Sequence, residues 1–295
     1  MSAQMTEGLV VKSHSDFRYV ETAAGILTCR LRGRLRLQGQ NVLCGDKVLV
    51  RVQDQGQGAI EQVLPRRNVL ERPPVANVDQ AVVVFTLAEP PLNMPLLERT
   101  LVAIEREGLD VVLCLNKLNL VSPEQVATCR QHFAGTGYQF LTTSALRGDG
   151  LLELRASLQG RLSVLAGPSG SGKSSLLNAL EGHGLATGSV SARLKRGRHT
   201  TRHVELFPIR PTGRVADTPG FSRLDLSGLP PGELDTCFPE FIPYLGLCRF
   251  TGCRHNSEPD CAVKQAVADG KLVAERYTRY LELLAELEEQ EKKRW

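Results

Sequence analysis

The sequence lacks any long hydrophobic run. Its apolar stretches, such as residues 81–85, are far shorter than the about 20 residues that a membrane-spanning helix needs. Its amino terminus is polar and has no apolar stretch of the kind found in secretory signals. We therefore expect a cytoplasmic protein with no membrane partner.

A disulfide framework is also missing. Half of the eight cysteines stand alone along the sequence, which is typical of reduced thiols. These isolated residues are Cys29, Cys44, Cys114 and Cys237. With 295 residues, of which 42% are hydrophobic, the chain can instead bury sizeable cores in two or three domains.

A strong net charge is absent as well. The formal charge is only +4, so the overall balance does not indicate a partner. Charge is concentrated locally, however, because residues 29–37 alternate in a way that places four arginines on one face of a predicted strand. The four are Arg30, Arg32, Arg34 and Arg36. Like charges repel unless an anion neutralises them, so we favour contact with nucleic acid over a merely solvated face.

Sequence patterns divide the chain into three segments. Residues 1–70 contain short strands separated by turns, which predict a small all-β barrel. Alternating strands and helices that follow a linker at residues 72–74 predict a parallel α/β domain, whose bounds, with the linker included, are residues 71–229. Residues 230–295 begin with prolines, cysteines and turns and end in a helical stripe, which predicts a mostly helical domain that packs through this stripe.

The predicted elements of the middle segment set the position of its motifs. We expect strands near residues 81–87, 111–115, 138–142, 162–166 and 213–216. We expect helices near residues 95–107, 123–133 and 175–180, with a further helix near residue 151.

A phosphate-binding loop follows the predicted strand at 162–166. It consists of Gly167, Pro168, Ser169, Gly170, Ser171, Gly172, Lys173 and Ser174. Glycines let backbone amides curl around phosphates, the lysine reaches the β- and γ-phosphates, and the Ser174 hydroxyl is suited to bind magnesium at the start of a helix. A structural glycine turn would not need the lysine, so we expect a nucleotide here.

A base-reading motif precedes this loop in the chain. It consists of Asn116, Lys117, Leu118 and Asn119, and it is followed later by Ser144 and Ala145, whose backbone can contact the base oxygen. In the usual motif an aspartate stands at the fourth position and accepts hydrogen bonds from two guanine donors. Asn119 has one acceptor and one donor group, so we expect guanine preference to be weakened. Ordinary GTPases carry these motifs after the phosphate loop, so the order here is rotated.

Two further loops complete the predicted magnesium site. Asp217 ends the predicted strand at 213–216 and can hold magnesium through water, while the Gly220 amide lies near the γ-phosphate. A threonine hydroxyl from the basic segment 193–202 can complete the magnesium shell, and we prefer Thr201 to Thr200.

The residue that activates water is less evident. Phe221 stands where many GTPases place the glutamine that orients the attacking water, so we expect slow intrinsic hydrolysis. His199 is the nearest candidate for a catalytic role, although a lone loop histidine is also common as an ordinary surface residue.

A cluster of metal ligands lies near the carboxyl end. Three thiols and one imidazole fall within 14 residues, which is enough for a tetrahedral zinc site that leaves no position for water. They are Cys248, Cys253, His255 and Cys261. We therefore expect one structural zinc ion, with unpaired cysteines in a turn as the alternative.

The rotated order, the segments 197–201 and 217–221 and the terminal Cys/His cluster together resemble the RsgA (YjeQ) family of circularly permuted GTPases over almost the entire chain. The resemblance implies an OB-fold barrel, a permuted P-loop GTPase domain and a zinc domain in the three segments. It implies that Asn116, Lys117 and residues 167–175, including Ser175, contact the nucleotide. It also implies that the four cysteine and histidine residues named above bind zinc. It also implies action late in the assembly of the small ribosomal subunit.

From these observations we expect a magnesium-dependent GTPase that binds GTP and GDP and works as a monomer. Its switch loop, residues 185–202, would order against rRNA when GTP is bound, and the ribosome would stimulate hydrolysis. One alternative is an RNA-binding assembly factor gated by nucleotide, with negligible hydrolysis, which Phe221 makes conceivable. An ATP-using protein is disfavoured by the base-reading residues.

Overall fold

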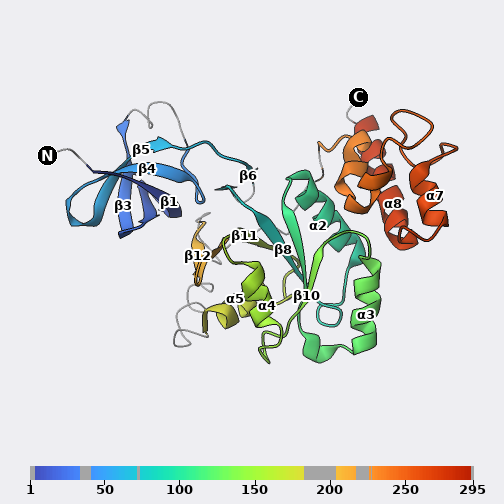
Figure 1. The fold of residues 1–295 in the computed structure, drawn as a ribbon, viewed down its shortest axis with the longest axis horizontal. Coiled ribbons are helices and arrows are strands. Elements are labelled where there is room, and N and C mark those ends of the chain that lie inside the picture. Colours follow the sequence, from blue (N-terminus) through green and yellow to red (C-terminus); the bar gives the residue numbers. More distant parts are fainter. Residues whose placement is uncertain are drawn as a thin grey trace. The chain divides into compact units, whose positions relative to one another are not determined.

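The computed structural model describes residues 4–33, 41–71, 74–182, 204–216, 226 and 228–293. Figure 1 shows the amino-terminal strands in blue, the central α/β elements from cyan to yellow and the carboxyl-terminal helices in orange and red. These described residues form a closed barrel, an α/β sheet and a helical region that carries the cysteine cluster. The predicted fold class is therefore confirmed.

The amino-terminal barrel has five strands. They are β1 (Met5–His14), β2 (Phe17–Thr22), β3 (Gly25–Leu31), β4 (Lys47–Val52) and β5 (Gln57–Val63), with η1 (Asp54–Gly56) before the last. Neighbours follow the order β1-β2-β3-β5-β4, and bulges in β1, opposite β2, and in β5, opposite β4, bend these strands as closure requires. Alternate side chains such as Val20, Val48, Val50 and Ile60 are fully buried and fill the interior. A Cβ on Gly58 would lie 2.6 Å from Val50, so this position needs glycine.

The predicted arginine face is only partly described. Arg30 lies in β3 and places its guanidinium 4.8 Å from the centre of the Phe17 ring, while Arg34 and Arg36 fall outside the described residues. Arg32 pairs with Glu61 at 2.5 Å, and Arg51 contacts the same carboxylate. The hydrogen bond from Arg51, supported by Arg32, holds the pKa of Glu61 below its usual value. The Glu61 carboxylate therefore neutralises part of the positive charge on the arginine face, the charge from which we predicted contact with nucleic acid.

Two short strands, β6 (Val69–Glu71) and β7 (Pro74–Ala76), follow the barrel as an antiparallel pair. The barrel also contacts the two residues just before β12 (Leu206–Ile209). The Cys44 thiol donates to the Val204 carbonyl at 3.0 Å, and Lys12 pairs with Glu205 at 2.9 Å. A hydrogen bond and an ion pair therefore connect Val204 and Glu205, which follow the predicted switch loop in the sequence, to the barrel.

Within the described ranges, the α/β sheet has six strands in the order β10-β9-β8-β11-β13-β12. The new strands are β8 (Gln80–Phe85), β9 (Asp110–Leu115), β10 (Gln139–Thr142), β11 (Leu162–Ala166) and β13 (Gly213–Ala216). Residues of β8 and β11 are buried throughout, as expected for central strands covered on both faces. The short strand β12, which pairs antiparallel with β13, was not predicted.

Helices connect these strands. They are α2 (Met94–Arg106), α3 (Pro123–His132), α4 (Leu151–Ser157) and α5 (Lys173–Gly182), with η2 (Leu118–Leu120) between β9 and α3. The Asn93 side chain caps α2 by accepting from the Leu96 amide, and Ser122 and Gln125 form a capping box at α3. Among the described residues, no helix combines the length and apolar character that crossing a bilayer requires.

The carboxyl-terminal region consists of η3 (Pro231–Cys237), η4 (Pro239–Tyr244), α7 (Ala262–Ala268) and α8 (Ala274–Lys292). Its core contains Phe238, Phe241 and Tyr280, with ring centres 5.1–5.3 Å apart. Leu284 and Leu287 of the predicted stripe are buried in the same core. The stripe is therefore a packing face, as predicted.

A buried charge cluster joins α8 to the helices of the α/β domain. Arg276 of α8 is 2% exposed and contacts Glu98 of α2 and Glu240 of η4, the latter at 2.5 Å. His132 of α3 contacts the other oxygen of Glu98 at 2.8 Å. Burial by itself would lower the pKa of Arg276, but the two carboxylates outweigh it and raise that pKa above its usual value. The cluster therefore keeps a charged arginine in the interior.

Replacing Arg276 with methionine removes the charge and keeps much of the packing volume. Because Glu98 and Glu240 would stay buried without their cation, we expect a loss of about 3–5 kcal/mol of unfolding free energy. The matched control is Arg279→Met, since Arg279 pairs with the exposed Glu282 on the same helix, and here we expect a change of less than about 1 kcal/mol. Urea unfolding of the two zinc-loaded variants is the measurement, and equal midpoints would contradict the assignment.

Candidate nucleotide and metal sites

Backbone shape at the phosphate loop depends on glycine. The loop leaves the buried strand β11 and ends where α5 begins, at Lys173. Gly167, Gly170 and Gly172 all have positive φ, between 81° and 124°. A Cβ on Gly167 would lie 2.0 Å from the Val84 carbonyl oxygen, and one on Gly172 would lie 2.2 Å from Asn116 Nδ2. Only glycine fits these positions, as a loop that curls around phosphates requires.

Lys173 lies inside the curve of the loop. Its ammonium group donates to the carbonyls of Gly167 at 2.7 Å and Pro168 at 2.8 Å. Burial lowers the pKa of this ammonium group below its usual value. A phosphate can replace the carbonyls as its partner and neutralise it, so the loop fits a nucleoside di- or triphosphate.

One side chain connects the phosphate loop to the base-reading loops. Asn116 follows β9 and is 1% exposed. Its Nδ2 donates to the Ser171 carbonyl at 2.9 Å, and its Oδ1 accepts from the Thr143 hydroxyl at 3.2 Å and from the Ala145 amide at 3.3 Å. Three loops that are far apart in the sequence are therefore held at one point.

The other base-reading residues lie around this point. Lys117 has a φ of 62° and donates from Nζ to the Glu89 carbonyl at 2.5 Å. Leu118 and Asn119 form the start of η2, and Asn119 Oδ1 accepts from the Ser144 hydroxyl at 2.9 Å. The structure thus brings the predicted base residues and the phosphate loop together.

The predicted magnesium and switch residues cannot be placed in the same way. Ser174 and Ser175 are exposed in the first turn of α5, next to Lys173. The remaining candidates fall outside the described residues. These are His199, Thr200, Thr201, Asp217, Gly220 and Phe221.

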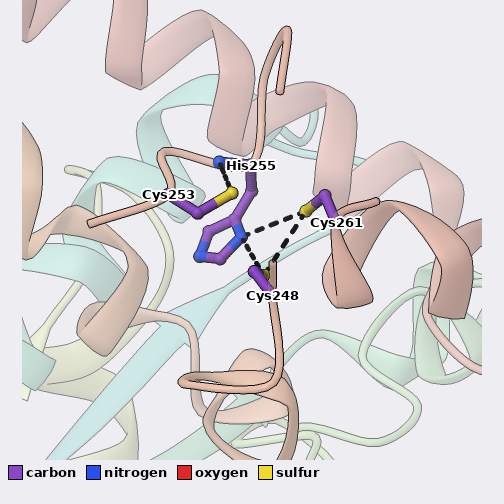
Figure 2. A group of neighbouring side chains, drawn as sticks. All are labelled: Cys248, Cys253, His255 and Cys261. Carbon is purple, nitrogen blue, oxygen red and sulfur yellow. Dashed lines mark hydrogen bonds between the residues drawn. The ribbon is translucent and has the colours of Figure 1, made fainter. Parts of the chain in front are cut away.

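The predicted metal ligands converge in the carboxyl-terminal region (Figure 2). The ligand atoms of Cys248, Cys253, His255 and Cys261 all lie within 4.8 Å of one another. His255 Nδ1 lies 3.5 Å from Cys248 Sγ and 3.3 Å from Cys261 Sγ, and these two sulfur atoms are 3.8 Å apart. Tetrahedral zinc, with bonds of about 2.0–2.3 Å, needs ligand atoms about 3.5–3.8 Å apart. The four residues therefore fit a structural zinc ion.

The imidazole ligand has a supporting shell. His255 Nε2 lies 3.3 Å from the Asp235 carboxylate, which favours the proton on Nε2 and leaves Nδ1 free to face the sulfur atoms. Tyr277 donates to the His255 carbonyl at 2.7 Å, and Tyr280 donates to the Arg254 carbonyl at 2.9 Å. Sequence reasoning missed Asp235, because it lies 20 residues from the histidine in a different turn.

Comparisons with known proteins agree with this geometry. The family described as RsgA GTPase matches residues 63–227, and the RsgA N-terminal domain matches residues 7–60. The small ribosomal subunit biogenesis GTPase RsgA of Moorella thermoacetica is 47% identical over 282 residues, covering 95% of this chain and 97% of that protein. The protein of the same name from Caldanaerobacter subterraneus subsp. tengcongensis is 43% identical, covering 98% of each chain.

Two solved structures share the fold. The crystal structure of YjeQ from Thermotoga maritima superposes with a TM-score of 0.84 at 36% identity, covering 96% of this chain and 99% of that chain. The structure of YloQ, described as a circularly permuted GTPase, has a TM-score of 0.83 at 33% identity, covering 97% and 96%.

The contact between Asp235 and His255 can be tested through zinc retention. Asp235→Asn removes the carboxylate that orients the imidazole, so we expect zinc affinity to fall about 10- to 100-fold. Asp260→Asn is the matched control, because Asp260 is next to Cys261 but its carboxylate pairs with the exposed Arg249. Competition against a chromogenic chelator measures both affinities. Equal zinc retention in the two variants would show that Asp235 has no such role.

Proposed function

The chain belongs to the RsgA family of GTPases, and from this premise we propose that it hydrolyses GTP and acts late in maturation of the small ribosomal subunit. One observation supports nucleotide binding most strongly. The side chain of Asn116 connects the base-reading loops to the phosphate loop through hydrogen bonds. A site that reads base and phosphate together needs this arrangement.

We assign the nucleotide contacts to the predicted residues. The base contacts are Asn116, Lys117, Leu118, Asn119, Ser144 and Ala145, and the phosphate contacts are residues 167–175. Lys173 would pair with the β- and γ-phosphates as charge develops during transfer. Bound magnesium would neutralise phosphate charge, held by Ser174 with Thr201 and Asp217, while the Gly220 amide would contact the γ-phosphate. His199 would orient the attacking water.

The other two regions supply the partner contacts in this proposal. We assign residues 1–70 to an OB-fold that contacts rRNA, residues 71–229 to the GTPase and residues 230–295 to the zinc domain. Arg30 is exposed and close to the Phe17 ring, a combination of cation and aromatic surface that suits RNA. The zinc ion would stabilise the loops between η4 and α7. The protein would work as a cytoplasmic monomer on the small subunit.

A nucleotide-gated RNA-binding factor without meaningful hydrolysis is the second candidate. The observation that favours it is Phe221, which cannot orient water as glutamine does. In that case GTP and GDP would set the affinity for the subunit, and nucleotide turnover would not depend on the ribosome.

Phosphate release with and without purified small subunits separates the two candidates. For the GTPase we expect the rate to rise at least about tenfold with small subunits, because one added group that positions charge or water can contribute about 10³-fold or more in phosphoryl transfer. Large subunits and the variant Lys173→Ala are the controls, and both should stay at background. A rate of phosphate release that stays unchanged when small subunits are bound would contradict the GTPase proposal and favour the nucleotide-gated RNA-binding factor.

A further inference from the structure

The residue at the base-recognition position is an amide. Asn119 stands where the usual motif has an aspartate, and its Oδ1 accepts from the Ser144 hydroxyl at 2.9 Å. It is half-buried in η2, and its partner Ser144 directly precedes Ala145, whose amide donates to Asn116. What this position can recognise therefore depends on the two ends of its amide group.

Ser144 fixes which end of the amide is which. The Arg147 amide donates to Ser144 Oγ at 3.2 Å, so the single hydroxyl proton is free to go to Asn119. In the structure this proton is donated to Asn119 Oδ1 at 2.9 Å, so Oδ1 rather than Nδ2 lies against the serine. Within the part of the chain that the structure describes, Nδ2 has no hydrogen-bond partner and is available to a ligand. Asn119 thus presents a donor where an aspartate would present a second acceptor.

Purines differ at the edge that this residue reads. Guanine offers two donors, N1–H and the 2-amino group, which match the two oxygens of a carboxylate. Xanthine offers N1–H and a carbonyl oxygen at C2, which match one acceptor and one donor. A donor that faces another donor loses its hydrogen bond and weakens binding about 5- to 150-fold, whereas a matched pair has no such loss. The amide of Asn119 is therefore complementary to xanthine rather than to guanine.

We propose that xanthosine di- and triphosphate are further ligands of this site, bound at least as tightly as the guanosine nucleotides. The proposal rests on the nucleotide site of the proposed function and specifies which base it accepts. Asn119 is the specificity-determining residue, and Ser144 is a positioning residue that acts through it.

The test is calorimetric titration of the full-length zinc-loaded protein with GDP and with XDP in the presence of magnesium. For the unaltered protein we expect the Kd for XDP to equal or fall below that for GDP. Asn119→Asp restores two acceptors, so the ratio of the two Kd values should shift at least about tenfold toward GDP. Asn41→Asp makes the same chemical change at an exposed position of the barrel and should leave the ratio unchanged.

Ser144→Ala adds a readout for the positioning role. Without the serine the amide can take either orientation, so we expect XDP to lose severalfold in affinity while GDP changes less. An equal loss for both nucleotides would overturn this role.

The outcomes also separate this inference from the proposed function. If the unaltered protein binds GDP more tightly than XDP, the base assignment is wrong and the GTPase proposal stands. If it binds neither nucleotide while retaining zinc, both proposals are wrong.

Discussion

The side chain of Asn116 is the constraint on which the nucleotide site depends. It is buried, and its amide satisfies a carbonyl of the phosphate loop on one side and a hydroxyl and a backbone amide of the later base loop on the other. Gly172 must be glycine because its Cβ would collide with this amide. Because these hydrogen bonds join loops that meet in space, the nucleotide site can form even though the base motifs precede the phosphate loop in this chain.

The rotated order has a consequence for how the nucleotide site connects to its surroundings. The predicted switch segment ends next to Val204 and Glu205, which are fastened to the barrel through Cys44 and Lys12. On the other side, α2 follows the strand β8 and holds Arg276 of the carboxyl-terminal helix through Glu98. The barrel therefore contacts the residues that follow the predicted switch segment in the sequence, and the carboxyl-terminal helix α8 contacts α2 of the α/β domain.

Sequence alone predicted the strands that are buried runs bounded by turn residues. Strands β11 and β13 occupy the predicted residues, and α2 lies within one residue of its prediction, because burial periodicity and caps are local signals. Strand β12 was missed because it is four residues long and contains a proline. The buried Arg276 and Glu98 were missed for another reason, since a charged residue in an amphipathic helix is expected at the surface and its partner lies 178 residues away. The identity of Asn119 was visible in the sequence, but the orientation of its amide depends on Ser144, which only the structure brings into contact.

Asn116 couples base recognition to the shape of the phosphate loop, and the variant Asn116→Ala tests this coupling. The measurement is the Kd of the full-length protein for magnesium GDP and for magnesium triphosphate, which has no base. We expect both ligands to lose affinity, by about tenfold or more, because the loop carbonyl of Ser171 loses its buried donor. A loss confined to GDP, with triphosphate binding unchanged, would contradict it.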